Sequence, residues 1–208
     1  MRILYIDTSS SFLYSGIIEE GKLLCEVKKE FGHSLSEEAL PEIVNMFNQN
    51  NLTAKEIDKI IVVNGPGSFT GIRIGITIAK VYAWSLNIPI TTITSLEAMM
   101  ISNNEKIIRV PMLDARRRYV FAAIYDENNN NILKPQHIKI DDLMLELNKL
   151  PNYLVITNDE LDEFPDSRSY NPDILKIVNY FQDKEAINPH AINPDYLKLT
   201  EAEESKLN

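Results

Sequence analysis

Residues 64–75 read NGPGSFTGIRIG and follow the short apolar run Ile60–Val63. Glycines permit a tight turn, and a long apolar stretch continues to Leu86, so the sequence predicts a strand, a loop and the start of a helix. Ser68 and Thr70 are both suited to cap the first free N–H groups of that helix. A helix start of this kind can hold an anion; the alternative is a purely structural turn.

Two known phosphate loops do not fit this spacing. The Walker pattern requires Lys after its last glycine, where Ile72 stands, and the dinucleotide fingerprint requires Gly or Ala where Thr70 stands. If the loop does hold an anion or a nucleotide, the residues expected to contribute are Gly65, Gly67, Ser68, Thr70 and Gly71.

The chain also contains an internal repeat. Shifted by about 107 positions, Ile3–Glu20 lies over Val110–Glu127 without a gap, and Asp7 falls on Asp114. Each copy reads as an apolar strand ending in Asp, a polar turn and a second apolar strand. The repeat predicts an α/β chain of two related lobes, an N-terminal lobe at 1–106 and a C-terminal lobe with its tail at 107–208.

The repeated aspartates are the best candidates for chemistry. Carboxylates at equivalent strand ends in two facing lobes would point into one cleft, where a magnesium nucleotide could bind together with Thr8 and Arg116. The alternative is that each Asp caps its own turn. Arg116 begins the only dense basic patch, 116–118, which suits a phosphate but is also typical of a solvated hairpin tip.

The predicted helix at 71–86 is apolar on most sides. Gly71, Gly75, Ala79 and Ala83 recur every four residues and form a smooth ridge that another helix could approach. A helix of this kind must be buried on most sides. It is therefore either a central helix of the chain's own core or one that meets a partner subunit.

The remaining pattern predicts a strand meander over 2–30, helices near 35–50, 95–101, 141–150 and 173–181, and strands at 60–63, 88–93, 107–125 and 153–157. Ser34 with Glu37 suggests a capping box, and Thr53 and Glu56 are expected to cap a short turn of helix. Pro41 predicts that the first helix is kinked there or starts near it.

Composition narrows the class of function. A net charge of −9 over 208 residues opposes broad nucleic-acid binding, so any RNA contact should be local or made through a partner. The single Cys25, the lack of an apolar leader and the lack of a membrane-length apolar run predict a cytoplasmic protein. No His pair, Cys cluster or Gly-x-Ser-x-Gly elbow occurs, so neither a zinc or iron site nor nucleophilic hydrolysis is expected.

Several segments together resemble the TsaB family, also called YeaZ. They are ILYIDTS at 3–9, NGPGSFTGIRIG at 64–75, AKVYAWSL at 79–86, SLEA at 95–98, LDARR at 113–117 and PDYLKLTEA at 194–202. The resemblance covers nearly the whole chain, and the GPGSFTG-x-RIG block is its most specific part. It implies a duplicated actin-like, sugar-kinase-like fold with a reduced second lobe.

The resemblance also implies a function. TsaB proteins help to make N6-threonylcarbamoyladenosine at position 37 of tRNAs that read codons beginning with A, and they are not the catalyst. They pair with the paralogue TsaD, which holds a metal through a His-x-x-x-His pair, and the ATPase TsaE joins them. The resemblance implies no metal, no catalytic residue and no intrinsic cofactor here, with ATP or ADP and Mg²⁺ at the partner interface as the one candidate ligand.

In that family the first two helices contact TsaD. Carried onto this sequence, together with the small-residue ridge, this predicts a partner interface at Leu40, Ile43, Val44, Phe47, Ile72, Gly75, Ile76, Ala79 and Ala83. The stretch His33–Pro41 is two residues longer than the usual family spacing, which would shift these contacts. Two alternatives stay open: a stand-alone ATPase or small-molecule kinase, and a homodimer that uses the same ridge. Contact with tRNA is expected only through the complex.

Overall fold

The repeat appears in the structure as two β-sheets with the same strand order. A computed structural model describes residues 1–103 and 105–198. The first sheet contains β1 (Arg2–Asp7), β2 (Phe12–Glu19), β3 (Lys22–Glu30), β4 (Lys59–Val63) and β5 (Ile90–Ile93), in the order β3-β2-β1-β4-β5. The second contains β6 (Ile108–Asp114), β7 (Tyr119–Tyr125), β8 (Asn131–Lys139) and β9 (Tyr153–Ile156), in the order β8-β7-β6-β9.

The pairing directions agree as well. In both sheets the first three strands form an antiparallel meander, and the first strand then pairs in parallel with a later one, β1 with β4 and β6 with β9. Asp7 ends β1 and Asp114 ends β6, so the register inferred from the sequence repeat is confirmed. The chain has the predicted α/β fold of two related lobes.

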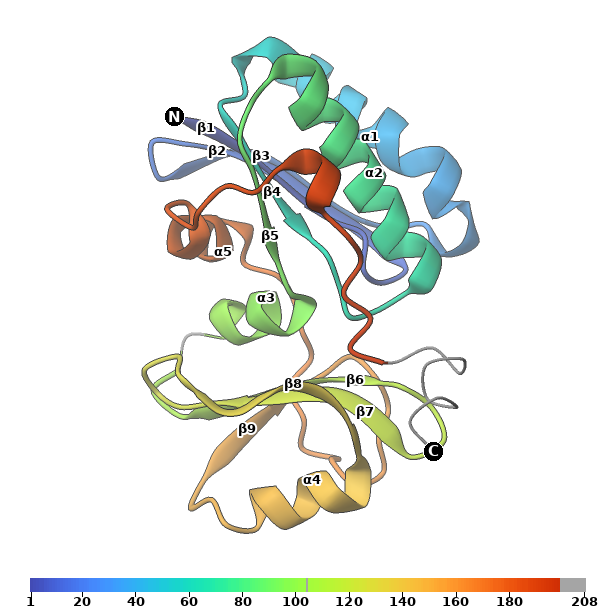
Figure 1. Cartoon of the computed structure of the whole chain (residues 1–208), viewed down its shortest axis with the longest axis vertical. Helices are drawn as coiled ribbons and strands as arrows, with labels where there is room; N and C mark the ends of the chain where they lie inside the picture. Colours follow the sequence, from blue (N-terminus) through green and yellow to red (C-terminus); the bar gives the residue numbers. More distant parts are fainter. Residues whose placement is uncertain (104, 199–208) are drawn as a thin grey trace.

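Helices cover the sheets in layers (Figure 1). Helices α1 (Leu35–Gln49) and α2 (Phe69–Leu86) pack on one face of the first sheet, and α3 (Ser95–Ser102) and α5 (Ile174–Phe181) lie on its other face. Helix α4 (Ile140–Leu147) covers the outer face of the second sheet. Short 3₁₀ turns lie at Gly32–Ser34, Ala54–Glu56 and Pro189–Ala191.

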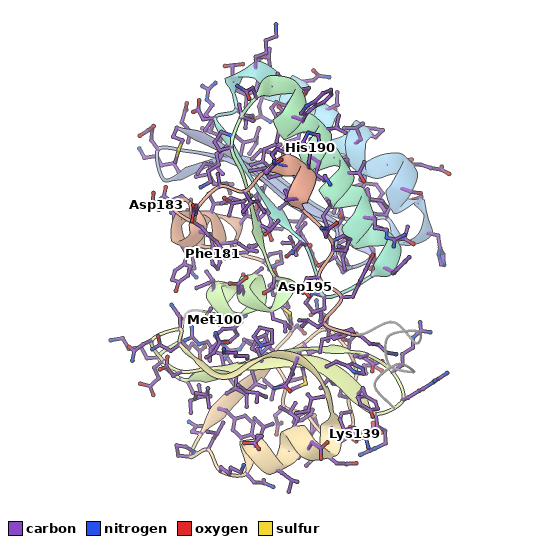
Figure 2. The ribbon with its side chains drawn as sticks, in the orientation of Figure 1. Met100, Lys139, Phe181, Asp183, His190 and Asp195 are labelled. Atoms are coloured by element: carbon purple, nitrogen blue, oxygen red, sulfur yellow. The ribbon has the colours of Figure 1, made fainter. Side chains whose placement is uncertain are left out.

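A single apolar core joins the two lobes. It runs from Tyr5 of β1 through α3 and α5 to Tyr125 of β7. Figure 2 shows Met100 of α3 and Phe181 of α5 in the layer between the sheets. Side chains of this layer therefore pack the two lobes against each other.

The C-terminal part of the chain returns to the first lobe, which differs from the predicted grouping of 107–208 as one lobe. Helix α5 contacts β1, β2 and β3, and the following segment runs beside α2. Lys59 of β4 anchors the return, because its buried Nζ donates to the carbonyls of Gln182 at 2.6 Å and Lys184 at 2.8 Å.

One prediction about a helix start was wrong and another was confirmed. The Ser34 hydroxyl donates to the Phe31 carbonyl at 2.9 Å instead of capping α1, because a 3₁₀ turn precedes this helix. Helix α1 begins at Leu35 and continues through Pro41. The capping box of Thr53 and Glu56 is present. The family motif at 194–202 can be followed to Lys198, and its remainder lies outside the described residues.

Candidate functional site

The glycine-rich loop connects β4 to α2 as predicted. Gly65 and Gly67 adopt φ angles of 116° and 152°, which L-residues with a side chain rarely adopt. Ser68 is the N-cap of α2, since its Oγ accepts from the N–H of Gly71 at 3.2 Å. Thr70 is not a cap, because α2 already begins at Phe69 and Thr70 lies in its first turn.

The loop is packed tightly against the turn that follows β1. The Ser68 N–H donates to the carbonyl of Ser9 at 2.7 Å, and the Thr8 hydroxyl donates to the carbonyl of Gly71 at 2.7 Å. A methyl group on Gly71 would collide with the Thr8 carbonyl, and one on Gly75 would collide with the Thr8 hydroxyl. These glycines therefore let α2 lie directly on the β1 turn.

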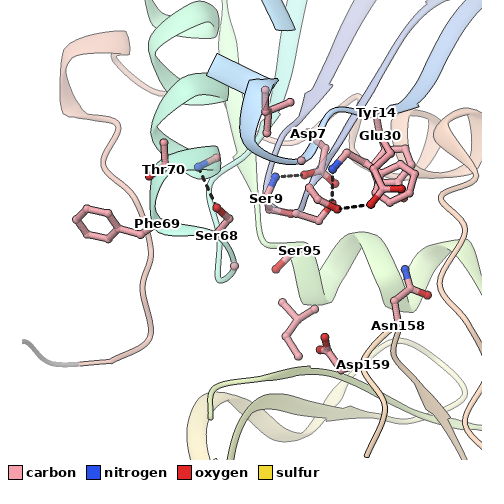
Figure 3. Close-up of a pocket in the computed structure, with 18 of the residues that line it drawn as sticks. Asp7, Ser9, Tyr14, Glu30, Ser68, Phe69, Thr70, Ser95, Asn158 and Asp159 are labelled. Atoms are coloured by element: carbon pink, nitrogen blue, oxygen red, sulfur yellow. Dashed lines mark hydrogen bonds between the residues drawn. The ribbon is translucent and has the colours of Figure 1, made fainter. Parts of the chain in front are cut away.

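A cavity of about 1140 Å³ opens beside this loop, between the strand ends of the two lobes. Figure 3 shows the α2 start, the β1–β2 turn and the second lobe facing it. Its wall includes Asp7, Ser9, Gly67, Ser68, Phe69, Thr70, Gly71, Asp114, Arg116, Asn158 and Asp159. Both repeated aspartates thus lie on one cavity, as predicted.

Two of the predicted ligand residues do not face the cavity. Thr8 is fully buried and its hydroxyl is used against α2. Gly65 lies under the C-terminal segment, where the Asp195 carbonyl covers it. Neither is therefore available to a nucleotide in this arrangement.

Asp7 is a buried carboxylate held by its own lobe. Its side chain is 2% exposed; Oδ1 accepts from the Ser9 N–H at 2.8 Å, and Oδ2 accepts from the Tyr5 hydroxyl at 3.3 Å. Burial raises the pKa of Asp7, although the hydrogen bonds from Ser9 and Tyr5 act in the opposite direction. Asp7 thus caps its own turn, which is the structural alternative considered from the sequence.

Asp114 has the same local geometry in an open setting. Its Oδ1 accepts from the Arg116 N–H at 2.8 Å, and its own N–H donates to Asp159 Oδ2 at 2.7 Å. Its side chain is exposed. The two copies of the repeat therefore differ in their surroundings: Asp7 is buried, and Asp114 is exposed on the cavity wall.

Tyrosines that the sequence reasoning did not single out surround Asp7. Tyr14 lines the cavity, and burial together with the charge of Asp7 raises its pKa to about 12. Tyr170, which approaches from the segment after β9, is half-buried in the cavity wall, and burial together with the charge of Asp7 raises its pKa well above the ordinary value. Sequence spacing contained no signal for Tyr170, because its placement depends on how the second lobe folds back.

The start of α2 gives the cavity two N–H groups that could bind an anionic group. The N–H groups of Phe69 and Thr70 have no acceptor among the described residues, and both residues line the cavity at the positive end of α2. Within residues 1–103 and 105–198, no group of three or more His, Cys, Asp or Glu side chains is placed to hold a metal ion.

Most of the predicted partner interface is enclosed by the chain itself. Ile43, Phe47, Ile72, Gly75, Ile76, Ala79 and Ala83 are buried against the first sheet. The small-residue ridge allows α2 to lie close to Thr8, so these residues cannot contact a partner in this fold. Leu40 and Val44, by contrast, are 51% and 48% exposed on α1.

Comparison with known proteins identifies the family. Residues 29–175 match the family model "TsaD: tRNA N6-adenosine threonylcarbamoyltransferase". The chain is 29% identical to the tRNA threonylcarbamoyladenosine biosynthesis protein TsaB of Bacillus subtilis, over 98% of this chain and 96% of that protein. The chain belongs to the TsaB (YeaZ) branch of this family.

Another TsaB protein and a solved structure are also similar to this chain. The Escherichia coli TsaB is 28% identical over 64% of this chain and 58% of its own length. The YeaZ structure from Pseudomonas aeruginosa superimposes with a TM-score of 0.72 at 17% identity, over 94% of this chain and 99% of that one. At that identity the likeness concerns the TsaB fold alone. None of the helices in residues 1–103 and 105–198 is long and apolar enough to cross a bilayer.

Proposed function

We propose that this chain is a non-catalytic scaffold and activator in the synthesis of N6-threonylcarbamoyladenosine at position 37 of tRNAs that read A-starting codons. Membership of the TsaB family supports a role in tRNA threonylcarbamoyladenosine biosynthesis. In this proposal the chain binds and stabilises a TsaD-type catalytic paralogue, and a TsaE-type ATPase joins the pair.

The observation that carries the proposal is an apolar surface on α1 and α2. Leu40 and Val44 lie one helical turn apart on α1, and Val81 of α2 is 58% exposed. Ile74 and Ile78 of α2 are half-buried. The two helices lie side by side in Figure 1, and the stacking of Phe47 on Tyr82 sets their register. We call this surface, Leu40, Val44, Ile74, Ile78 and Val81, the helical face; a surface of this kind is typical of a protein interface.

We propose that the chain is non-catalytic because two polar side chains of the cavity already make hydrogen bonds within the chain. Asp7, its buried carboxylate, already accepts hydrogen bonds from Ser9 and Tyr5, and the Ser68 hydroxyl is occupied as a helix cap. ATP or ADP is the proposed ligand at the partner interface, with its phosphates near the free N–H groups of Phe69 and Thr70. Since the described acids do not cluster, the nucleotide and the partner would supply most Mg²⁺ ligands.

Co-elution with the TsaD-type paralogue of the same organism, with light scattering to count subunits, tests this function. We expect a stable mixed complex with the wild-type chain. Leu40→Asp/Val44→Asp should weaken the complex at least about tenfold, because charges would be buried in an apolar contact. Leu145→Asp is the matched control, since Leu145 is 63% exposed on α4, away from the helical face.

The outcome decides between this function and its alternatives. Separate elution of the wild-type proteins, with and without ATP, would contradict the scaffold. ATP hydrolysis above background by the chain alone, abolished in Asp7→Asn, would support a stand-alone ATPase or small-molecule kinase instead. A two-subunit mass for the chain alone, reduced to one subunit by Leu40→Asp/Val44→Asp, would show that the helical face also pairs two copies.

A further inference from the structure

The turn between β6 and β7 has an unusual backbone. Arg116, Arg117 and Arg118 adopt φ angles of 65°, 54° and 63°, so three consecutive residues with long side chains occupy the left-handed region. This region is unfavourable for L-residues other than glycine. A turn of this kind persists only where its surroundings hold it in place.

Contacts around the turn fix it at both ends. The Asp114 carboxylate accepts from the Arg116 N–H, and the Tyr119 N–H donates to the Arg116 carbonyl at 3.0 Å. The Arg118 guanidinium donates to Asp141 and Glu163, each at 2.8 Å. Arg118 is therefore used to anchor the turn to the second lobe.

The other two arginines are left to solvent. The Arg116 and Arg117 side chains are exposed, and neither has a hydrogen bond or ion pair with any residue in 1–103 or 105–198. Arg116 also lines the cavity. The anchored turn thus presents two exposed guanidinium groups, of which Arg116 lies on the cavity wall.

Aromatic side chains continue this basic edge along the sheet. Tyr119 of β7 and His137 of β8 are half-buried and stacked, with ring centres 4.5 Å apart. Lys139, labelled in Figure 2, lies opposite Tyr119 in the register, with its Nζ 5.9 Å from the Tyr119 ring. We call Arg116, Arg117, Tyr119, His137 and Lys139 the basic aromatic edge.

The chemistry of this edge suits RNA. Guanidinium and ammonium groups bind backbone phosphates, and exposed faces of aromatic rings stack on unpaired bases. Arg118 forms ion pairs with the neighbouring carboxylates of Asp141 and Glu163 and offsets one of their two negative charges. A chain of net charge −9 attracts no polyanion over a distance, so the contact must be short-range and confined to this edge.

We infer that the basic aromatic edge contacts the RNA substrate directly, with Arg116 and Arg117 on backbone phosphates and the Tyr119–His137 stack beside a base. The inference rests on the proposed function, which brings a tRNA to the complex. It goes further by giving this subunit its own RNA contact. A bound nucleotide has the same phosphate and base chemistry, so the experiment must separate the two ligands.

The test measures binding of an unmodified tRNA that reads an A-starting codon. It uses the chain alone and the mixed complex with the TsaD-type paralogue, over a range of salt concentrations. In whichever assembly binds tRNA, the double variant Arg116→Ala/Arg117→Ala should raise the Kd for tRNA about tenfold. The slope of the logarithm of the binding constant against the logarithm of salt concentration should become shallower by about two, one for each lost phosphate contact. Lys22→Ala/Lys55→Ala removes the same charge from exposed first-lobe positions and should change neither value.

ADP and ATP binding by the single variant Arg117→Ala forms the second arm and should be unchanged, because Arg117, unlike Arg116, does not line the cavity. Complex formation is read separately by co-elution, so loss of the proposed scaffold function is not confused with loss of the RNA contact. Unchanged tRNA affinity in the arginine variant would overturn the inference. So would a lack of tRNA binding by both wild-type assemblies, or a variant that loses nucleotide but keeps tRNA.

Discussion

Asp7 and Asp114, which end equivalent strands in the two lobes, each accept a hydrogen bond from the backbone N–H two residues later, at 2.8 Å in both copies. The donors are Ser9 and Arg116. The local turn has been kept while its surroundings have diverged: Asp7 is enclosed by tyrosines, and Asp114 is exposed to solvent. The same residue in the same turn should therefore respond differently to substitution.

Asp7→Asn tests the effect of burial on the pH dependence of stability. Burial raises the pKa of Asp7, so its contribution to folding is fully present below the unfolded pKa of about 3.9 and is lost as pH rises through the folded pKa. Asn keeps the acceptor for Ser9 but carries no charge. The stability of the variant relative to wild type should hence increase from pH 4 to pH 7, measured by urea unfolding.

Asp114→Asn is the matched control for this prediction. It makes the same change at an exposed position and keeps the acceptor for the Arg116 N–H, so it shows how much of the response comes from the change of residue type alone. An equal pH response in both variants would contradict the role assigned to burial.

Ser68→Ala should destabilise the protein by about 1 kcal/mol, because the α2 cap to the Gly71 N–H is lost. Thr70→Ala, at the other capping position suggested by the sequence, should cost less than about 0.5 kcal/mol because Thr70 is exposed and caps nothing. Chemical denaturation of both variants checks the assignment. Equal losses would show that the hydroxyl of Thr70 also supports the helix start.

The sequence alone predicted the elements whose signals are local. The glycine loop, the repeated Asp turns and the Thr53–Glu56 capping box were all read correctly, because each depends on residues within a few positions. The capping box predicted at Ser34 was wrong, since the 3₁₀ turn before α1 places that hydroxyl on the Phe31 carbonyl. Strand β8 was missed, because its residues alternate weakly between apolar and polar.

Long-range placement was not predictable in the same way. The return of α5 to the first sheet depends on Lys59 binding carbonyls more than 120 residues away in the chain, which no spacing reveals. The small residues of α2 fit two roles equally well in the sequence. Only the packing shows that Gly71 and Gly75 let α2 lie in contact with Thr8.

Gly75→Ala tests that packing. The added methyl group would meet the Thr8 hydroxyl, which already donates to the Gly71 carbonyl, so we expect a loss of about 1–3 kcal/mol of stability. Thr77→Ala, on the exposed side of the same helix, should change stability by less than about 0.5 kcal/mol. A stable Gly75→Ala protein with weakened partner binding would instead place this ridge at an interface.

Arg117→Gly separates the cost of the left-handed turn from the use of its side chain. Glycine adopts a φ of 54° without the steric penalty that arginine pays, so the variant should be more stable than wild type by about 1 kcal/mol. Arg117→Ala removes the same side chain but keeps the penalty, and it should show no such gain. If both variants were equally stabilised, removal of the charge rather than relief of the backbone would be the cause. Thermal unfolding of the two Arg117 variants measures the cost of the left-handed backbone. The tRNA measurements show separately whether the Arg117 side chain binds RNA.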